Sequence, residues 1–240
     1  MTIRPSFSTL LSSIVILAAF TALCALGIWQ VKRLAWKEGI ISKLDAAYAH
    51  TADSAPLDLT SIQPGDYSYG WVEGIFMPDK ALLLGPRTRE GRIGNDLIVP
   101  LKIKDRTLLI NMGWTDAALE DLPITHVQDK KIRFAGLAFT PSWNRFTPDN
   151  DPAQDLWFKP DIQEIAQVRG LANSFPFILY AQEASYKFDA TFPNNTKYYP
   201  NNNHLQYAIF WFTMAFLLLI MTGIVITSRK RGRSSPPLKA

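Results

Sequence analysis

One histidine stands at a chemically useful place, the start of the second of two long apolar segments. His204 follows a run of asparagines, and Tyr207 and Trp211 lie three and seven residues further on. In a helix these side chains share one face, and Ala208, four residues on, is expected to open a gap beside the imidazole. A neutral imidazole at a membrane boundary is a good axial ligand for haem iron. The other interpretation is an interfacial aromatic belt, and the residues alone leave both open.

A second candidate is the glycine-bounded run 84–94, which holds three arginines. Arg87, Arg89 and Arg92 fall within six positions. Guanidinium groups form paired hydrogen bonds with carboxylates and phosphates, so Arg87 is a candidate contact for haem propionates or phosphate head groups. A solvated loop between two strands is the favoured alternative, because charged residues are common at hairpin tips.

Residues for enzyme chemistry are scarce. The sequence contains no nucleophile, phosphate-loop or zinc-protease motif. His50 and His126 lie among ordinary loop residues, where a histidine is usually at the surface. Cys24 is the one cysteine, so the chain forms no internal disulfide and no Cys-based metal site. We therefore expect a protein that is not an enzyme and that has no catalytic residues.

The charge balance does not indicate a polyanion partner. The 240 residues include 25 Lys and Arg against 21 Asp and Glu, a net charge of +4. Arg4 and the five basic residues after position 228 account for this excess, so the segment 30–203 is slightly acidic. We therefore expect no nucleic-acid partner.

Two uncharged apolar segments are long enough to cross a bilayer, since about 20 helical residues span a hydrocarbon core of about 30 Å. The basic cluster 229–233 marks the cytoplasmic side, and two spans return the N-terminus to that side. A cleaved signal peptide is the rival interpretation of the first segment. The predicted organisation is a cytoplasmic N-terminus 1–9, transmembrane helices 10–29 and 204–227, an extracytoplasmic domain 30–203 and a basic cytoplasmic tail 228–240.

Strand and turn signals alternate within the segment between the spans. The first helix is expected to continue to Tyr48, and Asp161, with Glu164 three residues on, predicts an N-cap for a short helix. Turns are expected at Gly85-Pro86, Gly91, Gly94-Asn95, Asp105-Arg106 and Thr140-Pro141. Strands are predicted at 67–77, 81–84, 97–103, 107–111, 131–139 and 177–182. The predicted fold class is an α+β membrane protein, with two transmembrane helices flanking one β-rich domain, a small barrel or sandwich with a short helix.

Four blocks carry a resemblance to a known family. They are Leu26–Lys37, Gly85–Arg87 followed by Ile110–Trp114, Phe146–Pro152, and Asn202–Phe212. In this order, and between two apolar spans, they resemble the surfeit-locus (Surf/Shy) assembly factors of cytochrome c oxidase. Met112 departs from the pattern, because the family usually has Arg at this position, and any charge-based role for it is in doubt.

The resemblance implies a non-catalytic assembly factor that binds haem a and promotes its insertion into the core subunit of a haem-copper oxidase. In bacterial members a histidine at the position of His204 is implicated in holding haem a, so the resemblance favours His204 as iron ligand. Tyr207, Trp211 and Arg87 complete the expected cofactor-binding set, although the Arg87 contact is not part of the family pattern.

The expected partners are the oxidase core subunit, the lipid bilayer and, as a further possibility, the machinery of haem a synthesis. The short stretch before the first span favours a bacterial inner membrane, with both termini cytoplasmic and the domain periplasmic. The alternative function is a two-span scaffold that stabilises an oxidase subunit without binding haem.

Overall fold

The computed structural model describes residues 7–49, 55–188 and 192–233. The chain divides into two compact units, Met1–Ile41 with Pro200–Ala240, and Ser42–Tyr199. Each unit is described by itself. Residues 1–6 and 234–240 of the predicted cytoplasmic ends lie outside the described residues, as does His50.

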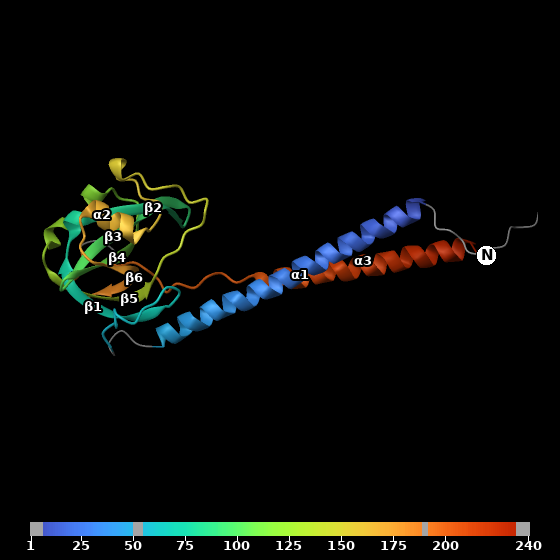
Figure 1. The fold of residues 1–240 in the computed structure, drawn as a ribbon, viewed down its shortest axis with the longest axis horizontal. Coiled ribbons are helices and arrows are strands. Elements are labelled where there is room, and N and C mark those ends of the chain that lie inside the picture. The colour runs from blue at the N-terminus through green and yellow to red at the C-terminus, as the bar shows by residue number, and fades with distance from the viewer. Residues whose placement is uncertain (1–6, 50–54, 189–191, 234–240) are drawn as a thin grey trace, which may run out of the picture. The chain divides into compact units, whose positions relative to one another are not determined.

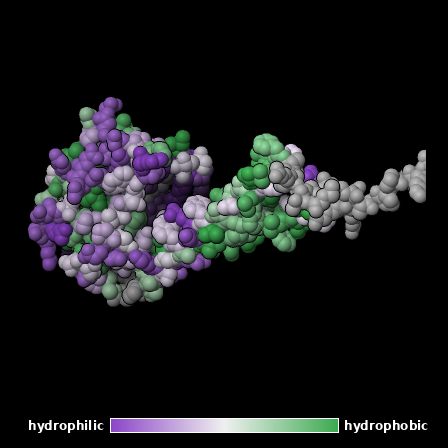
Figure 2. Space-filling view, turned by 45° about the vertical axis from the view of Figure 1, so that its right-hand side comes forward, coloured by the Kyte–Doolittle hydropathy of each residue, from purple (hydrophilic) through white to green (hydrophobic). Residues whose placement is uncertain are grey.

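The first unit contains two long helices, α1 (Phe7–Tyr48) and α3 (His204–Arg233) (Figure 1). It includes α1 as far as Ile41 and the whole of α3. Both are long and apolar enough to cross a membrane. Their outward-facing side chains are mainly hydrophobic (Figure 2). A helix satisfies its own backbone hydrogen bonds, so such a surface suits a lipid environment. The predicted apolar helices at the two ends of the chain are confirmed, and α1 continues to Tyr48 as expected.

Small residues are buried where the two helices approach. A Cβ atom added to Gly27 would lie 2.7 Å from the Phe212 ring. Ala208 and Ala215 are also buried. Small side chains at such a contact allow the neighbouring backbone to come close. The expected gap at Ala208 beside His204 stays a prediction.

The second unit contains a six-stranded sheet in the order β1-β5-β6-β4-β3-β2, in which β1 also pairs with β3. Five strands therefore close into a ring, and β2 is added beside β3, which makes a small barrel rather than a sandwich. The β4–β6 pair is parallel and the others are antiparallel. The strands are β1 (Ser68–Phe76), β2 (Leu82–Arg89), β3 (Arg92–Ile103), β4 (Arg106–Thr115), β5 (Lys131–Phe139) and β6 (Ser174–Ala184). Short 3-10 turns occur at Pro78–Lys80, Leu119–Asp121, Thr125–Val127 and Pro152–Gln154.

Two apolar clusters hold this unit together. The larger one includes Phe76, Phe134 and Leu108, all fully buried. The smaller one joins Leu109 of β4 to Ile165 of the short helix α2 (Ile162–Arg169). Strand β4 is thus buried on both faces, which explains its continuous apolar sequence. Burying each such side chain contributes about 1.5–3 kcal/mol.

The predicted cap of α2 is confirmed. The Asp161 carboxylate accepts hydrogen bonds from the backbone N–H groups of Gln163 (3.0 Å) and Glu164 (3.2 Å). Gly170 ends the helix in the left-handed conformation, with φ of 61°. This cap sets where the helix begins over the sheet, and with it the position of Ile165 in the smaller cluster.

Two of the predicted turns, Gly85-Pro86 and Gly94-Asn95, are wrong, because both pairs lie inside strands. The register shifts between Leu84 and Arg87, so Gly85-Pro86 occupies an irregularity in β2. A Cβ on Gly94 would overlap the Trp114 ring, so that glycine serves a close approach. The turn predicted at Gly91 is confirmed, and Glu90 and Gly91 form it with φ of 51° and 79°.

Candidate functional site

His204 is the first residue of α3 and is half-buried. The chain enters the helix through Asn203, whose backbone carbonyl accepts a hydrogen bond from the N–H of Tyr207 (3.3 Å). The side-chain oxygen of Asn202 is buried and has no hydrogen-bond partner among the described residues. The imidazole therefore stands at a helix start that already contains one unsatisfied polar atom.

Gln30 of α1 is the hydrogen-bond partner of His204. Its side chain is buried, and its Oε1 lies 2.7 Å from Nδ1 of the imidazole. An amide oxygen only accepts hydrogen bonds, so Nδ1 is the donor in this contact, and in the neutral form of such a ring Nε2 keeps the lone pair. The Trp29 ring stands perpendicular to the imidazole, with ring centroids 6.4 Å apart. The imidazole is thus held by α1 through Nδ1, and Nε2 takes no part in this contact.

The other two predicted residues of α3 lie in the same unit as His204. Tyr207 is exposed, and Trp211 is half-buried. The indole N–H of Trp211 is buried and has no hydrogen-bond partner in the described part of the chain. Its ring contacts Phe210 edge to face, with centroids 5.2 Å apart. These rings supply an aromatic surface along the helix below His204.

Gln30 and Trp29 are not among the site residues predicted from the sequence. Both lie in the first block of the resemblance, Leu26–Lys37, and Gln30 is a polar residue at the end of an otherwise apolar run. A polar side chain that is buried on such a helix calls for a partner. The sequence therefore indicates that Gln30 needs a hydrogen-bond partner. It does not indicate that this partner is His204, 174 positions away.

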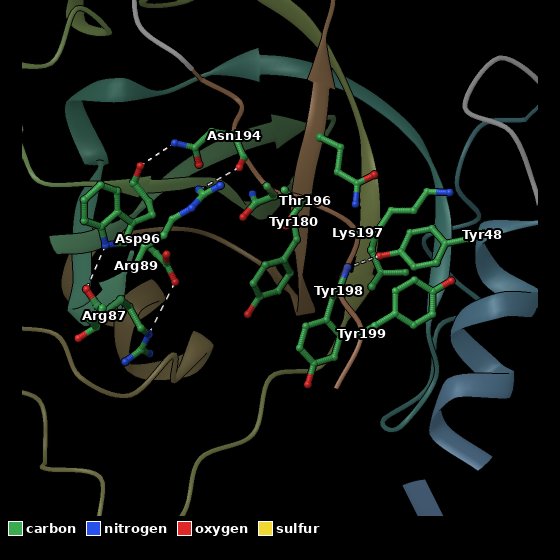
Figure 3. A pocket seen from close by; sticks show the side chains of 15 residues that line it. Tyr48, Arg87, Arg89, Asp96, Tyr180, Asn194, Thr196, Lys197, Tyr198 and Tyr199 are labelled. Atoms are coloured by element: carbon green, nitrogen blue, oxygen red, sulfur yellow. Dashed lines mark hydrogen bonds and ion pairs between the residues drawn. The ribbon is translucent and has the colours of Figure 1, made fainter. Parts of the chain in front are cut away.

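Arg87 belongs to the other unit and lines a cavity of about 490 Å³ (Figure 3). The sequence predicted that Arg87 lies in a loop. This prediction is wrong, because Arg87 lies in β2 together with Arg89. The two residues are two positions apart, so their side chains leave the same face of the strand, and both are half-buried. Lys197 lies on the opposite wall of the cavity (Figure 3).

Hydrogen bonds hold the two arginines in place. Nε of Arg87 lies 3.7 Å from the carboxylate of Asp96, with which it forms an ion pair. The backbone carbonyl of Arg87 accepts a hydrogen bond from the indole N–H of Trp114 (3.0 Å). Arg89 donates to the backbone carbonyl of Asn194 (3.3 Å). Burial raises the pKa of Asp96, and the guanidinium of Arg87 opposes this rise. Three cationic side chains against one acidic group make the cavity favourable for anions.

The segment 192–199 forms one wall of this cavity. The backbone N–H of Asn194 donates to the carbonyl of Met112 (3.0 Å), and its side chain donates to the carbonyl of Trp114 (2.6 Å). Between them lies Gly113, with φ of 107°, where any Cβ would overlap the Asn194 side chain. Met112 itself is fully buried in the main core, which suits its apolar side chain.

A second cavity of about 600 Å³ shares Arg87, Asp96 and Tyr180 with the first. The Tyr180 ring stacks on Phe139, with centroids 4.5 Å apart and planes 8° apart. Burial raises the pKa of Tyr180, so its hydroxyl is neutral. The two cavities therefore combine flat aromatic walls with cationic groups.

His126 lies in the 3-10 turn Thr125–Val127 and is exposed. In the residues that the structure describes, no group of three or more His, Cys, Asp or Glu side chains is arranged to hold a metal ion.

Comparison with known proteins places the chain in a family. Residues 17–216 match the SURF1 family, a stretch that includes most of α1, all six strands and His204. The chain is 27% identical to a SURF1-like protein of Rickettsia felis over 217 residues, which cover 88% of this chain and 94% of that protein. It is 28% identical to a SURF1-like protein of Caenorhabditis elegans over 227 residues, which cover 82% of this chain and 68% of that protein. It is 27% identical to surfeit locus protein 1 of Xenopus tropicalis over 208 residues, which cover 78% of this chain and 67% of that protein. The chain therefore belongs to the SURF1 family, whose members are generally assembly factors of cytochrome c oxidase.

Proposed function

We propose that this protein binds haem a and promotes its insertion into the core subunit of a haem-copper oxidase, with Nε2 of His204 as a ligand to the haem iron. The observation that carries the proposal is the contact between His204 and Gln30. It engages Nδ1 of the imidazole at the start of α3 and leaves Nε2 as the ring nitrogen that can bind iron.

The residues around His204 fit a haem. Bound haem supplies an iron that accepts a neutral imidazole nitrogen as axial ligand. Trp29, Tyr207 and Trp211 offer aromatic surface for a flat apolar ligand. The unpaired indole N–H of Trp211 and the unpaired Asn202 oxygen are polar groups with which an incoming ligand can bond.

Arg87 has the chemistry for a carboxylate contact, and haem a carries propionates. Arg87 and Arg89 offer guanidinium groups from one face of β2, in a cavity whose charge favours anions. We include Arg87 in the cofactor-binding set on this basis. Arg87 lies in the β-barrel unit and His204 in the helical unit.

Such a role requires no catalytic group. Reversible ligation and an aromatic surface are enough to hold and release a haem, so the protein acts as an assembly factor and not as an enzyme. We place it in a bacterial inner membrane as a two-span protein, with both termini cytoplasmic and the barrel in the periplasm. Its partners are then the bilayer, the oxidase core subunit and the machinery that makes haem a.

The test is the optical spectrum of the protein purified in mild detergent from cells that make haem a. We expect a haem spectrum for the wild type and its loss in His204→Ala. The control is His126→Ala, which removes an exposed histidine of the barrel unit and should keep the spectrum. An unchanged haem spectrum in His204→Ala would exclude this residue as the ligand.

The same preparation separates the proposal from a scaffold that binds no haem. A scaffold predicts copurification with oxidase subunits and no haem absorbance in any variant. For the carboxylate contact, Arg87→Gln should weaken haem retention, whereas Arg145→Gln, at an exposed position, should not. Equal retention in these two variants would remove Arg87 from the site.

A further inference from the structure

Gln30 is a buried polar residue in the apolar helix α1. Its side chain is 8% exposed in a helix whose neighbouring residues Ile28, Trp29 and Val31 are exposed and mainly apolar. Burying an amide is costly unless it is hydrogen-bonded. The only side-chain partner that the structure gives this amide, within the described residues, is the His204 imidazole at 2.7 Å.

We infer that Gln30 is a positioning residue that selects the tautomer of His204, keeping the proton on Nδ1 and the lone pair on Nε2. This inference rests on the proposed function, in which Nε2 is the metal-binding atom. Histidines that bind metals generally donate their other ring N–H to an acceptor, and this second contact sets both ring orientation and ligand strength. In this chain the acceptor comes from the other helix.

The contact also restricts where the ring points. The hydrogen bond runs from α3 to α1, and the Trp29 ring stands at 87° to the imidazole plane. Rotation of the imidazole about the side-chain bonds of His204 would break this hydrogen bond. Gln30 therefore holds the ring in one orientation, in which Nδ1 and not Nε2 meets the acceptor on α1.

The first experiment does not need haem. The chain has three histidines, so ¹⁵N-histidine labelling gives few signals, and His204→Ala identifies those of His204. In the haem-free protein we expect the ¹⁵N shifts of a protonated Nδ1 and an unprotonated Nε2. Gln30→Met removes the acceptor at similar length and should give a mixture of tautomers. Gln30→Glu keeps an acceptor oxygen and should restore the Nδ1-protonated form.

The second experiment measures haem. Loss of a contact of this kind typically weakens metal binding about 10–100-fold. We expect Gln30→Met to lose haem affinity within that range and to show an altered spectrum, and Gln30→Glu to retain binding. Gln206→Met, a glutamine exposed on α3, is the matched control and should behave as the wild type.

The outcomes separate the two proposals. A wild-type His204 protonated on Nε2, or a Gln30→Met variant with wild-type tautomer and haem affinity, overturns the role of Gln30 and leaves haem binding by the protein intact. A wild type that takes up no haem but shows the expected tautomer, shifted in Gln30→Met, overturns haem binding while Gln30 still orients His204.

Discussion

Asp96 shows how one buried carboxyl group shapes the cavity of the barrel. Its carboxylate is the acidic partner of Arg87, at 3.7 Å, and its side chain is 22% exposed. Burial disfavours the charged form and raises its pKa, although Arg87 acts in the opposite direction. An anion that enters the cavity therefore meets an arginine that is already oriented by a weakly stabilised carboxylate.

This raised pKa predicts a pH dependence of stability. Because the folded state holds the Asp96 proton more tightly than the unfolded state, its contribution is present below the ordinary pKa of 3.8 and is lost as the pH rises through the folded pKa. Asp96→Asn removes the titrating group. We expect its free energy of unfolding to fall less than that of the wild type between about pH 4 and pH 7, measured by urea titration in detergent.

Asp58→Asn provides a control of opposite sign. Hydrogen bonds from Thr60 lower the pKa of Asp58, so its contribution is present above 3.8 and is lost as the pH falls. The free energy of unfolding of Asp58→Asn should therefore be lower than that of the wild type at neutral pH. A wild-type pH profile in Asp96→Asn would show that this carboxyl group does not titrate differently in the fold.

At the scale of elements, the segment 192–199 and strand β4 depend on one glycine. Gly113 combines a φ of 107° with the closest approach of Asn194, which binds the carbonyls on both sides of it. Side chains rarely adopt this φ, and here there is also no room for one. The wall of the cavity thus depends on Gly113, where both the backbone conformation and the contact with Asn194 exclude a side chain.

Gly113→Ala and Gly91→Ala separate these two effects. Gly91 lies in the exposed hairpin turn with φ of 79°, and nothing lies within 4 Å of an added Cβ. Its alanine variant should cost only the backbone strain, about 1 kcal/mol. Gly113→Ala should cost more, about 2–4 kcal/mol, because the Asn194 contacts are also lost.

Both alanine variants are measured by urea unfolding under one set of conditions, with tryptophan fluorescence as the signal. The difference between them reports the contact with Asn194. Equal losses of stability in the two variants would mean that the segment 192–199 is not held at β4.

At the scale of the whole molecule, two kinds of surface follow from two kinds of sequence. The helical unit exposes Leu, Ile and Phe, whereas the barrel unit is mainly hydrophilic outside its core (Figure 2). Backbone hydrogen bonds within α1 and α3 permit burial in lipid, while the strands of the barrel pair in a closed ring and leave β2 as its added edge. The proposed cytoplasmic location of the tail rests on the basic cluster 229–233 at the end of α3.

The proposed orientation predicts which positions are reached from outside the inner membrane. In a Cys24→Ser background, Gln63→Cys lies in the barrel unit and Ser228→Cys lies near the end of α3. We expect a membrane-impermeant maleimide to label Gln63→Cys in intact spheroplasts and to label Ser228→Cys only after lysis. The opposite pattern would invert the topology and place the barrel in the cytoplasm.

Local patterns in the sequence were sufficient for the elements of this fold. Two uncharged stretches predicted the apolar helices, alternation at 67–77 and short runs between turn-forming residues predicted the six strands, and Asp161 with Glu164 predicted the cap of α2. These signals depend on neighbours in the chain, since helix capping and strand alternation act over a few residues. The same reasoning misplaced turns at Gly85 and Gly94, because a glycine that admits a neighbouring strand or ring looks like a glycine in a turn.

The sequence by itself thus determined the apolar spans, the strands and the candidate histidine, and only the tertiary structure decided what surrounds each functional group. Gln30 meets His204 across 174 positions, and Asn194 reaches Trp114 across 80. Arg87 pairs with Asp96 because β2 and β3 are adjacent with a shifted register. Hydrogen bonds and ion pairs act over about 3 to 4 Å. Which side chains come that close depends on how helices and strands pack, and not on their separation along the chain.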